Sequence, residues 1–361
     1  MGGNLQATDR GMRQGATYAL LAALLFGAST PFAKLLLTDT SPVLLAGLLY
    51  GGSGVGLGVW LGLRRRLRPR HRHPGVAWHS GEMRWLAGAI AAGGVLGPIM
   101  LMAGLARMTA ANASLLLNME GVFTALLAWF VFRENFDRRI VAGMLAIVAG
   151  GVALAWPRHL ALGASAGAAW IAGACACWAL DNNLTRRVSV QDPVLIAALK
   201  GLVAGTVDLG IAAAAGAHWP AAAHILAASL VGLAGYGVSL ALFVLALRHL
   251  GAARTGAYFS TAPFIGAAAS LLLFRQIPGL VFWVAALLMG AGVWLHLTER
   301  HAHLHSHGRI RHAHSHVHDE HHRHSHDFEW DGREPHYHEH THQPLTHSHA
   351  HFPDIHHRHE H

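Results

Sequence analysis

Charged residues and cysteines are both scarce in this chain of 361 residues. Only 13% of the residues are charged and 53% are hydrophobic, which argues against an ordinary soluble domain, where about 25% are charged. The two cysteines, Cys175 and Cys177, stand two positions apart in an apolar run, and a helix would point them to nearly opposite faces. They therefore predict neither a disulfide nor a metal site, and we expect a buried structural role.

Sequence motifs of enzyme catalysis are also missing. The chain contains no recognisable nucleophile motif, phosphate-binding loop or catalytic metal motif. We therefore predict that it is not an enzyme and that it requires no cofactor. The net charge of +8 first suggests an acidic partner, but most arginines lie in loops between apolar runs, where they indicate membrane topology. The predicted partner is the lipid bilayer, and nucleic acid is not expected to bind.

Long apolar runs are the main feature that is present. About 20 apolar residues in a helix cover roughly 30 Å of hydrocarbon, and ten runs of about this length follow a polar lead, 1–14. They cover about 15–37, 42–63, 85–105, 109–134, 140–156, 164–184, 193–215, 222–247, 251–276 and 279–297. Pro31 and Pro98 lie inside runs and are expected to mark kinks. The sequence predicts an all-α membrane protein with ten transmembrane helices, followed by a tail of different composition, 298–361.

An internal repeat divides the runs into two halves. The stretch Thr109–Glu134 aligns without a gap to Gly251–Gln276. We therefore assign one five-helix repeat to 15–156 and a second to 157–297. Five is an odd number, so the second repeat should enter the membrane in the opposite sense from the first, which is the inverted arrangement of many secondary transporters.

The distribution of arginine predicts the orientation in the membrane. A basic block, Arg64–Gly75, follows the second run and would not be carried through lipid. With the N-terminus inside, most arginines fall in cytoplasmic segments, and the outer connections hold only Arg107, Arg158 and Arg275. By the positive-inside rule, both termini should be cytoplasmic and the protein should lie in the cytoplasmic (inner) membrane.

Four separated segments carry a resemblance to a known family. They are FGASTPFAK in the first run, ASLLLNMEGVFTALLAWFVFRE in the fourth, WALDNNLTRR in the sixth and ARTGAYFSTAPFIGAAASLLLFRQ in the ninth. Over about Gly15–Leu297 the chain resembles the EamA family of the drug/metabolite transporter superfamily. The resemblance implies a ten-helix bundle that transports a small metabolite or an amino-acid-like solute. Gly121 stands where the second repeat has Pro263, and Gln276 stands where the family usually has an acidic residue, so equal gating by the halves is not expected.

Glu120 is the main candidate for function because it lies near the middle of the fourth run. A charged carboxylate at the centre of a bilayer costs at least about 2.5 kcal/mol, so such a group faces a cavity, pairs with another group or is held protonated. In one interpretation it couples protons or contacts a cationic solute in a central cavity. In the other it is a neutral carboxyl group that joins two helices by a hydrogen bond.

Four further residues are candidates for a substrate or coupling site. Lys200 and Asp208 lie about two helical turns apart in the seventh run. They either line the cavity with Glu120 or pair with groups on other helices. Trp178 in the sixth run and Tyr258 near the start of the ninth could stack on a ligand, but aromatic residues at the membrane interface explain them equally well.

The tail is rich in histidine, with 23 of the 31 histidines between positions 301 and 361. Few of its residues are apolar, so we expect it to be disordered without a ligand. Neutral imidazole suits zinc, nickel, cobalt and copper, and protonation below about pH 6 would release them. The alternative is a pH-sensitive polyelectrolyte without a metal. The candidate ligands are His301, His303, His305, His307, His312, His314, His316, His318, His321, His322, His324, His326, His336, His338, His340 and His342.

These features favour a multi-pass secondary transporter that works by alternating access. Its cargo is either a small metabolite or a divalent metal or metal complex, and its tail binds transition metal as a regulator or delivery arm. The alternative is a membrane anchor that transports nothing and buffers or presents metal to a partner. The sequence also allows a homodimer.

Overall fold

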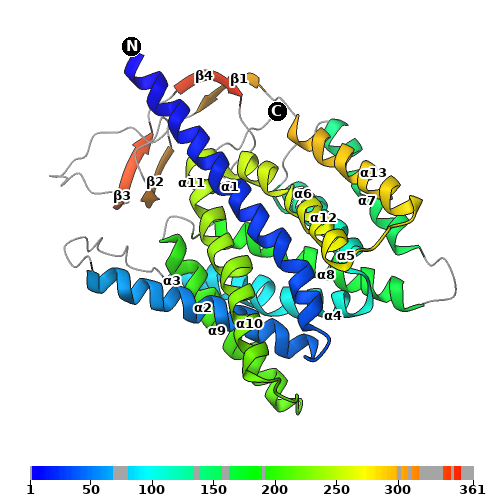
Figure 1. Cartoon of the computed structure of the whole chain (residues 1–361). Helices are drawn as coiled ribbons and strands as arrows, with labels where there is room; N and C mark the ends of the chain where they lie inside the picture. The colour runs from blue at the N-terminus through cyan, green and yellow to red at the C-terminus, as the bar shows by residue number, and fades with distance from the viewer. Residues whose placement is uncertain are drawn as a thin grey trace. The chain divides into compact units, whose positions relative to one another are not determined.

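The structure is a computed structural model that describes residues 2–67, 80–132, 138–156, 162–186, 188, 192–298, 302–307, 310–316, 336–342 and 345–350. The helices belong to one compact unit and the strands of the tail belong to a second (Figure 1). The helical elements are α1 (Gly2–Leu36), α2 (Pro42–Leu67), α3 (Ser80–Ala89), η1 (Ile90–Leu96), α4 (Gly97–Arg107), α5 (Ala110–Leu116), α6 (Met119–Phe132), α7 (Arg138–Ala155), α8 (Leu162–Arg186), α9 (Pro193–Ala214), α10 (Ala222–Gly232), η2 (Leu233–Val238), α11 (Ser239–Phe259), α12 (Ala262–Phe274) and α13 (Leu280–Leu297). The elements η1 and η2 are π-helices.

Eight helical segments of the described chain are long and apolar enough to cross a membrane. They are Arg13–Leu36, Pro42–Arg64, Glu82–Arg107, Ala110–Leu127, Arg138–Ala155, Pro193–Ala214, Ala222–Leu247 and Thr255–Phe274. Each falls on one of the ten expected runs. The two remaining runs correspond to α8, which has 25 residues, and to α13, which contains a shorter apolar helix, Leu280–Leu295. Multiple apolar helices therefore establish a multi-pass membrane protein.

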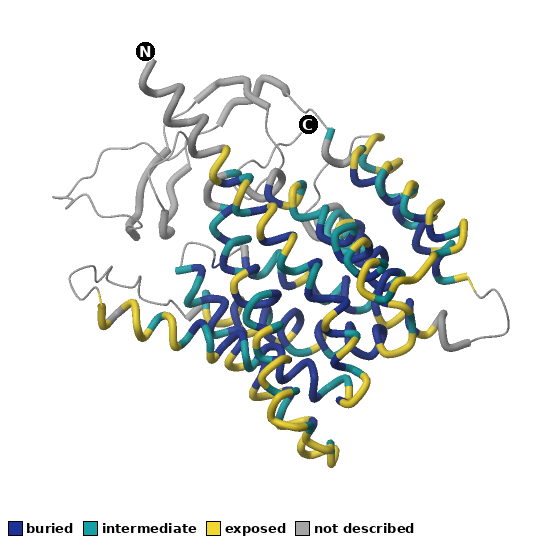
Figure 2. The backbone as a smooth tube through the Cα atoms, viewed as in Figure 1, coloured by how far each residue is buried: buried dark blue, intermediate teal, exposed yellow. Residues whose placement is uncertain are grey.

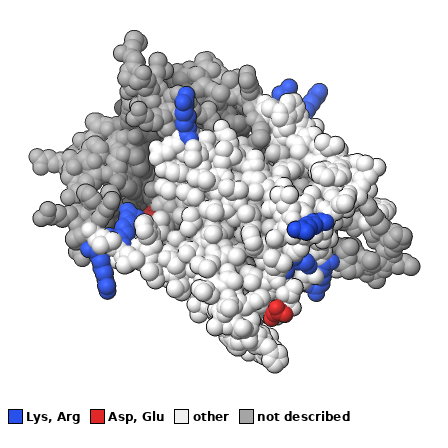
Figure 3. Space-filling view, viewed as in Figure 1, with Lys and Arg blue, Asp and Glu red and all other residues white. Residues whose placement is uncertain are grey.

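The surface of the helical unit is apolar, as contact with lipid requires. Large hydrophobic side chains are mostly exposed on several helices, for example Leu272 at 80% and Leu287 at 74%. Buried residues line the inner sides of the helices (Figure 2). The face in Figure 3 has few charged side chains, separated by a broad uncharged area. A water-soluble protein rarely exposes so much contiguous apolar surface.

Close glycine contacts join α2 to α9. A Cβ added to Gly54 would meet the backbone of Gly201 and Leu202, and one added to Gly205 would meet the backbone of Gly51. As the residue number rises along α2 it falls along α9, so the two helices pack antiparallel. Small residues allow this approach of two backbones, which is a common way for helices to pack within a membrane.

The helices α7 and α13 pack in the same antiparallel sense and lie side by side in Figure 1. A Cβ at Gly150 would lie 3.0 Å from the carbonyl oxygen of Ala285, and a Cβ at Gly292 would lie 2.6 Å from that of Gly143. In the sequence, α7 is the fifth run of the first half and α13 is the fifth run of the second. Corresponding helices of the two halves thus contact each other and run in opposite directions.

Helix irregularities occur at matching positions in the two halves. The alignment that pairs Thr109 with Gly251 also pairs Gly93 in η1 with Gly235 in η2. It also pairs the break between α5 and α6 with the break between α11 and α12. The predicted kink near Pro98 is therefore present as a π-helix, and it recurs in the second half, where no proline stands at that position.

Two expected helix boundaries differ from the structure. The connection expected after about residue 247 lies inside α11, which is continuous from Ser239 to Phe259. In the first half the corresponding turn is fixed because the Thr109 side chain accepts a hydrogen bond from the backbone N–H of Asn112. Its counterpart, Gly251, has no side chain to form this cap, and the helix continues.

The first helix also departs from expectation. It begins at Gly2, before the expected span, so the polar lead is helical, and it continues through Pro31. Near its end, the Lys34 ammonium donates to the carbonyl oxygen of Leu105 at 2.6 Å. This carbonyl lies in the last turn of α4, where a cation stabilises the helix terminus.

The described part of the tail forms strands, whereas the sequence analysis expected disorder. The strand β1 (Ala302–His307) pairs antiparallel with β4 (Leu345–Ala350), and β2 (Ile310–His316) pairs antiparallel with β3 (His336–His342). The physical reason is the alternation of histidine with other residues, because a period of two is the period of a strand. The expected disorder rested on the low apolar content of the tail, which does not take this period into account.

Candidate functional site

A pocket lies among helices from both halves of the chain. Its empty space, including the part open to solvent, is about 550 Å³. Six of its thirteen lining residues are aromatic, against 8% in the whole chain. The lining residues are Phe26, Tyr50, Glu120, Trp178, Asp181, Asn182, Lys200, Gly235, Tyr236, Ser239, Leu240, Phe243 and Phe259.

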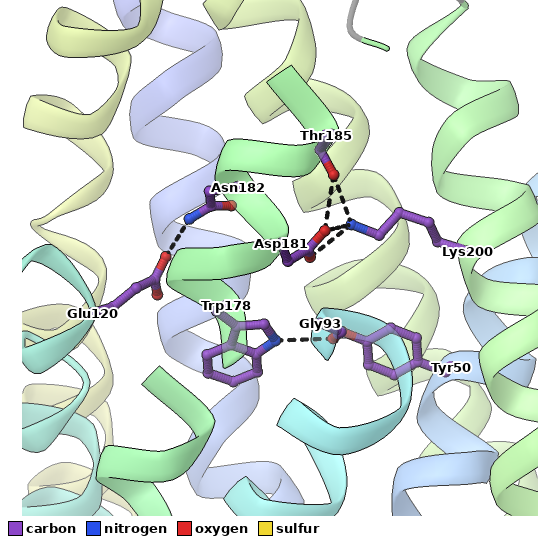
Figure 4. Close-up of polar contacts among 8 residues, drawn as sticks. All are labelled: Tyr50, Gly93, Glu120, Trp178, Asp181, Asn182, Thr185 and Lys200. Atoms are coloured by element: carbon purple, nitrogen blue, oxygen red, sulfur yellow. Dashed lines mark hydrogen bonds and ion pairs between the residues drawn. The ribbon is translucent and has the colours of Figure 1, made fainter. Parts of the chain in front are cut away.

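The helix α8 supplies three of these residues from one face. Trp178, Asp181 and Asn182 are three and four positions apart, which is the spacing of neighbours on a helix surface. Asp181 and Asn182 are consecutive, so their side chains diverge by about 100° around the axis. Figure 4 shows the result: Asn182 points toward Glu120, and Asp181 points toward Lys200 on α9. One helix thereby contacts two polar groups on two other helices.

Asp181 and Lys200 form a buried ion pair. The Lys200 ammonium donates to Asp181 Oδ1 at 2.6 Å and to Oδ2 at 2.7 Å. It also donates to Thr185 Oγ1 at 3.3 Å, and that hydroxyl donates to Asp181 Oδ1 at 2.8 Å. The ammonium is thus held by both oxygens of one carboxylate and by a hydroxyl group. Both side chains are almost fully buried, where an unpaired charge would be very costly.

Glu120 lies in the first turn of α6, directly after the break in the fourth run. The break is stabilised by Asn118, whose Nδ2 donates to the carbonyl oxygen of Leu115 at 2.9 Å. Glu120 Oε1 accepts a hydrogen bond from Asn182 Nδ2 at 2.6 Å, and no second bond to this carboxylate is formed by the described residues. The start of a helix favours a negative charge, so the break supports a carboxylate that faces the pocket.

The backbone carbonyl of Gly93 is free because of the nearby proline. In η1 the N–H of Gly97 donates to the carbonyl oxygen of Ala92 and not to that of Gly93. The next residue, Pro98, has no N–H to donate. The Gly93 oxygen therefore lacks a donor from its own helix and can accept hydrogen bonds from side chains.

Two aromatic side chains use this free carbonyl. Trp178 Nε1 and the Tyr50 hydroxyl both donate to the Gly93 oxygen at 3.0 Å (Figure 4). These bonds satisfy the polar ends of two buried rings and fix their orientation in the pocket wall. Gly93 itself has no room for a side chain, since an added Cβ would meet the carboxylate of Asp181.

The aromatic rings of the lining form a connected cluster around Phe26. The Phe26 ring centroid lies 5.7 Å from that of Trp178, 5.7 Å from that of Tyr236 and 5.5 Å from that of Phe259. The first two pairs are edge-to-face, a favourable arrangement for aromatic rings. Phe243 extends the cluster through Phe259 at 4.8 Å. Aromatic carbon therefore forms much of the pocket wall.

Of the five residues predicted for a substrate or coupling site, the structure brings three together. Glu120, Trp178 and Lys200 line the pocket. Lys200 satisfies both interpretations, because it faces the pocket and pairs with another helix. Asp208 lies elsewhere in α9, fully buried, and neither of its carboxylate oxygens has a hydrogen-bond partner among the described residues. Tyr258 is 38% exposed and does not line the pocket.

Several lining residues were not predicted from the sequence. Asp181 and Asn182 lie in the segment WALDNNLTRR of the sixth run, where a carboxylate is a signal comparable with Glu120. Tyr50, Tyr236 and Phe26 gave no signal in the sequence, because an aromatic residue in an apolar run looks the same whether it faces lipid, another helix or a pocket.

The expected burial holds for Cys175, whereas Cys177 is only partly buried. Both are free, and Cys175 is buried. The Cys175 thiol donates to the carbonyl oxygens of Leu116 and Leu117 at 3.7 and 3.8 Å. These carbonyls lie at the break between α5 and α6, so the thiol helps to satisfy backbone groups that the break releases.

The predicted metal ligands of the tail fall into two groups. The residues outside the described part of the chain are His301, His318, His321, His322, His324 and His326. The others lie on β1, β2 and β3. Among the residues whose placement is described, no group of three or more His, Cys, Asp or Glu could hold a metal ion.

Comparisons with known proteins agree on a family. The model of the EamA-like transporter family matches the chain twice, at residues 13–156 and 165–298. An uncharacterized transporter from Methanothermobacter thermautotrophicus is 27% identical over 291 residues, which cover 76% of this chain and 84% of that protein. One crystal structure is similar with a TM-score of 0.57 at 18% identity, over 78% of this chain and 96% of its own. This last likeness concerns the fold alone.

Proposed function

Because the chain belongs to the EamA-like transporter family, we propose that it is a secondary transporter that moves a small solute across the cytoplasmic membrane by alternating access. Ten membrane-spanning helices form two inverted five-helix repeats, and both termini are cytoplasmic. The observation that carries this proposal is the pocket. Its lining comes from both halves of the chain, including Phe26, Tyr50 and Glu120 from the first and Trp178, Lys200 and Tyr236 from the second. A site between inverted repeats is where secondary transporters bind their solute.

The antiparallel contacts of corresponding helices support the inverted arrangement. In the sequence, α2 and α9 are the second runs of the two halves, and α7 and α13 are the fifth runs. If the second repeat crosses the membrane in the opposite sense, corresponding helices that meet must be antiparallel, as both pairs are. Small residues on both helices form the contact between α2 and α9. Such a contact would allow the two repeats to rock against each other.

The lining favours an organic metabolite over a divalent metal as cargo. Its carboxylates are Glu120 and Asp181, and Asp181 is already occupied by Lys200. Neither histidine nor cysteine is among the lining residues, although these are the usual ligands of nickel, cobalt, zinc and copper. Six aromatic rings, in contrast, suit a molecule with an apolar or flat body.

Transport from a mixture of solutes tests the proposal and the role of Glu120. The full chain is reconstituted in liposomes loaded with the small-molecule fraction of a cell extract and salts of nickel, cobalt, zinc and copper. We expect mass spectrometry to find at least one solute that leaves faster than from protein-free liposomes. Glu120→Gln should slow its release about tenfold or more, because a site carboxylate is replaced by a neutral amide.

The matched control is Asp39→Asn, which alters an exposed carboxylate outside the pocket and should leave the rate unchanged. Equal rates for wild type and Glu120→Gln would assign Glu120 to helix packing. If the wild-type protein releases no solute while it still binds metal, the chain is a membrane anchor and the transport proposal is wrong.

We propose in addition that the tail binds transition metal. The register of β2 and β3 places His312 opposite His340, His314 opposite His338, and His316 opposite His336. Alternate residues of a strand share a face, and directly opposed residues have Cβ atoms about 4.5–5.5 Å apart. Six histidine positions therefore share one face of this ladder. Histidines at opposed positions can supply imidazole ligands for zinc, nickel, cobalt or copper.

Metal binding by the full chain should depend on these histidines and on pH. We expect equilibrium dialysis with nickel at pH 7.5 to show fewer bound ions after replacement of His312, His314 and His316 by asparagine. Replacing the interleaved Ala313 and Ser315 by asparagine is the control. Imidazole must be neutral to bind metal, and its reference pKa is about 6.5, so binding should be present at pH 7.5 and mostly lost at pH 5.5. If the three substitutions leave the number of bound nickel ions unchanged, the β2–β3 ladder is not the site.

A further inference from the structure

The charges of the pocket do not cancel. Its lining contains two carboxylates, Glu120 and Asp181, and one ammonium, Lys200. Lys200 is already paired with the Asp181 carboxylate and also donates to Thr185, so its charge is offset within the protein. The Glu120 carboxylate accepts one hydrogen bond from Asn182 and has no ammonium or guanidinium partner in the described helices. Glu120 is therefore the acidic group of the lining that has no cationic partner among the residues described.

The rest of the wall attracts positive charge in a second way. Aromatic faces carry negative electrostatic potential, so they attract cations as well as apolar groups. Trp178 is the strongest type of ring for this contact, and its N–H is already used by the Gly93 carbonyl. The Tyr50 hydroxyl donates to the same carbonyl. The two rings are thus held in place by hydrogen bonds to the protein itself, and no solute is needed to satisfy their polar atoms.

We propose that the pocket binds an organic cation, in which a protonated amine or a quaternary ammonium group is joined to an apolar or aromatic body. The cationic group pairs with Glu120, whose position is held by Asn182, and the body packs against the ring cluster around Phe26. This inference rests on the proposed transport function and specifies its solute. A carboxylate solute would meet Glu120 without a free cation to offset the repulsion. A hydrated metal ion would meet aromatic carbon in place of ligands.

Three probes of similar size and shape test whether the charge of the solute, and not its size, determines binding. They are phenethylamine, which is cationic at neutral pH, 2-phenylethanol, which is neutral, and phenylacetate, which is anionic. Binding of each to the detergent-solubilised full chain is measured by calorimetry. We expect phenethylamine to bind at least tenfold more tightly than either analogue. Glu120→Gln should weaken phenethylamine by tenfold or more and leave the weak binding of 2-phenylethanol unchanged, whereas Asp39→Asn should change neither.

A second variant tests the proposal independently in case Glu120→Gln does not fold. Phe243→Leu keeps an apolar side chain in the lining but removes a ring, and it should weaken phenethylamine several-fold. Equal binding of the three probes, tighter binding of phenylacetate, or no binding of the amine would overturn the organic-cation proposal. If the liposome assay then identifies a neutral or anionic solute, transport stands and only the solute class is wrong. If the amine binds at Glu120 but no solute crosses the membrane, the class stands and transport is wrong.

Discussion

Replacing Lys200 by methionine should destabilise the folded chain by about 3–5 kcal/mol, the usual cost of removing one partner of a buried ion pair. The methionine fills a similar volume, so the loss comes from the Asp181 carboxylate, which would keep only the Thr185 hydroxyl as a partner. The pair lies between α8 and α9 with both side chains almost fully buried, so the carboxylate left behind would be poorly solvated. Thermal unfolding in detergent, followed by circular dichroism, measures the effect.

A double variant separates the charge from the packing. Asp181→Leu combined with Lys200→Met removes both charges and should recover most of the lost stability, because a buried ion pair can often be exchanged for apolar residues at little cost. The exposed pair Arg64–Asp192, at 3.3 Å, is the matched control. Arg64→Met should change stability by no more than about 1 kcal/mol. If Lys200→Met costs no more than Arg64→Met, the pair does not hold α8 to α9.

The parts of the fold that the sequence predicts are those that depend on local composition. In lipid, the backbone N–H and C=O groups of a segment must form hydrogen bonds within the protein, which a helix achieves by itself. A long enough apolar run therefore predicts a membrane-spanning helix. Eight of the expected runs coincide with described helices that are long and apolar enough to cross a membrane, and the repeat that was visible in Thr109–Glu134 and Gly251–Gln276 is matched by the two family segments. Glu120 was found for the same local reason, since a carboxylate within an apolar run is costly unless it has a role.

The site itself depends on contacts that local composition does not encode. Tyr50 and Trp178 meet at the carbonyl of Gly93, which lies 43 and 85 positions away from them. Pro98 predicted an irregular helix, but not which side chains would use the oxygen that it frees. Asp208 illustrates the converse problem: it has the same local signal as Glu120, yet it lies outside the pocket lining.

Two errors show where a local rule was applied too broadly. Low apolar content predicted disorder in the tail, although the alternation of histidine already had the period of a strand. A connection was also expected near residue 250 because the first half has one at the equivalent place. That turn depends on the side chain of Thr109, and a repeat that lacks the capping residue need not repeat the turn.

The π-helix residue Gly93 is where the second large effect is expected. Its carbonyl orients Trp178 and Tyr50, and an added Cβ would meet the Asp181 carboxylate and push it away from Lys200. Gly93→Ala should therefore cost about 3–5 kcal/mol, comparable with breaking the ion pair directly. It should also weaken solute binding, since the pocket wall must shift. Thermal unfolding of the purified full chain measures the first effect, and calorimetry measures the second.

Gly210 is the matched control for Gly93→Ala. It also lies within a helix, but a Cβ added there meets no atom within 4 Å among the described residues. Gly210→Ala should change stability by no more than about 1 kcal/mol, because only the helix propensity differs. In the background Asp181→Gly with Lys200→Met, the Cβ at position 93 no longer meets any of the Asp181 side-chain atoms that it meets in the wild type, so Gly93→Ala should cost much less than in the wild type. A cost that stays the same in both backgrounds would show that Gly93 acts through a contact other than Asp181.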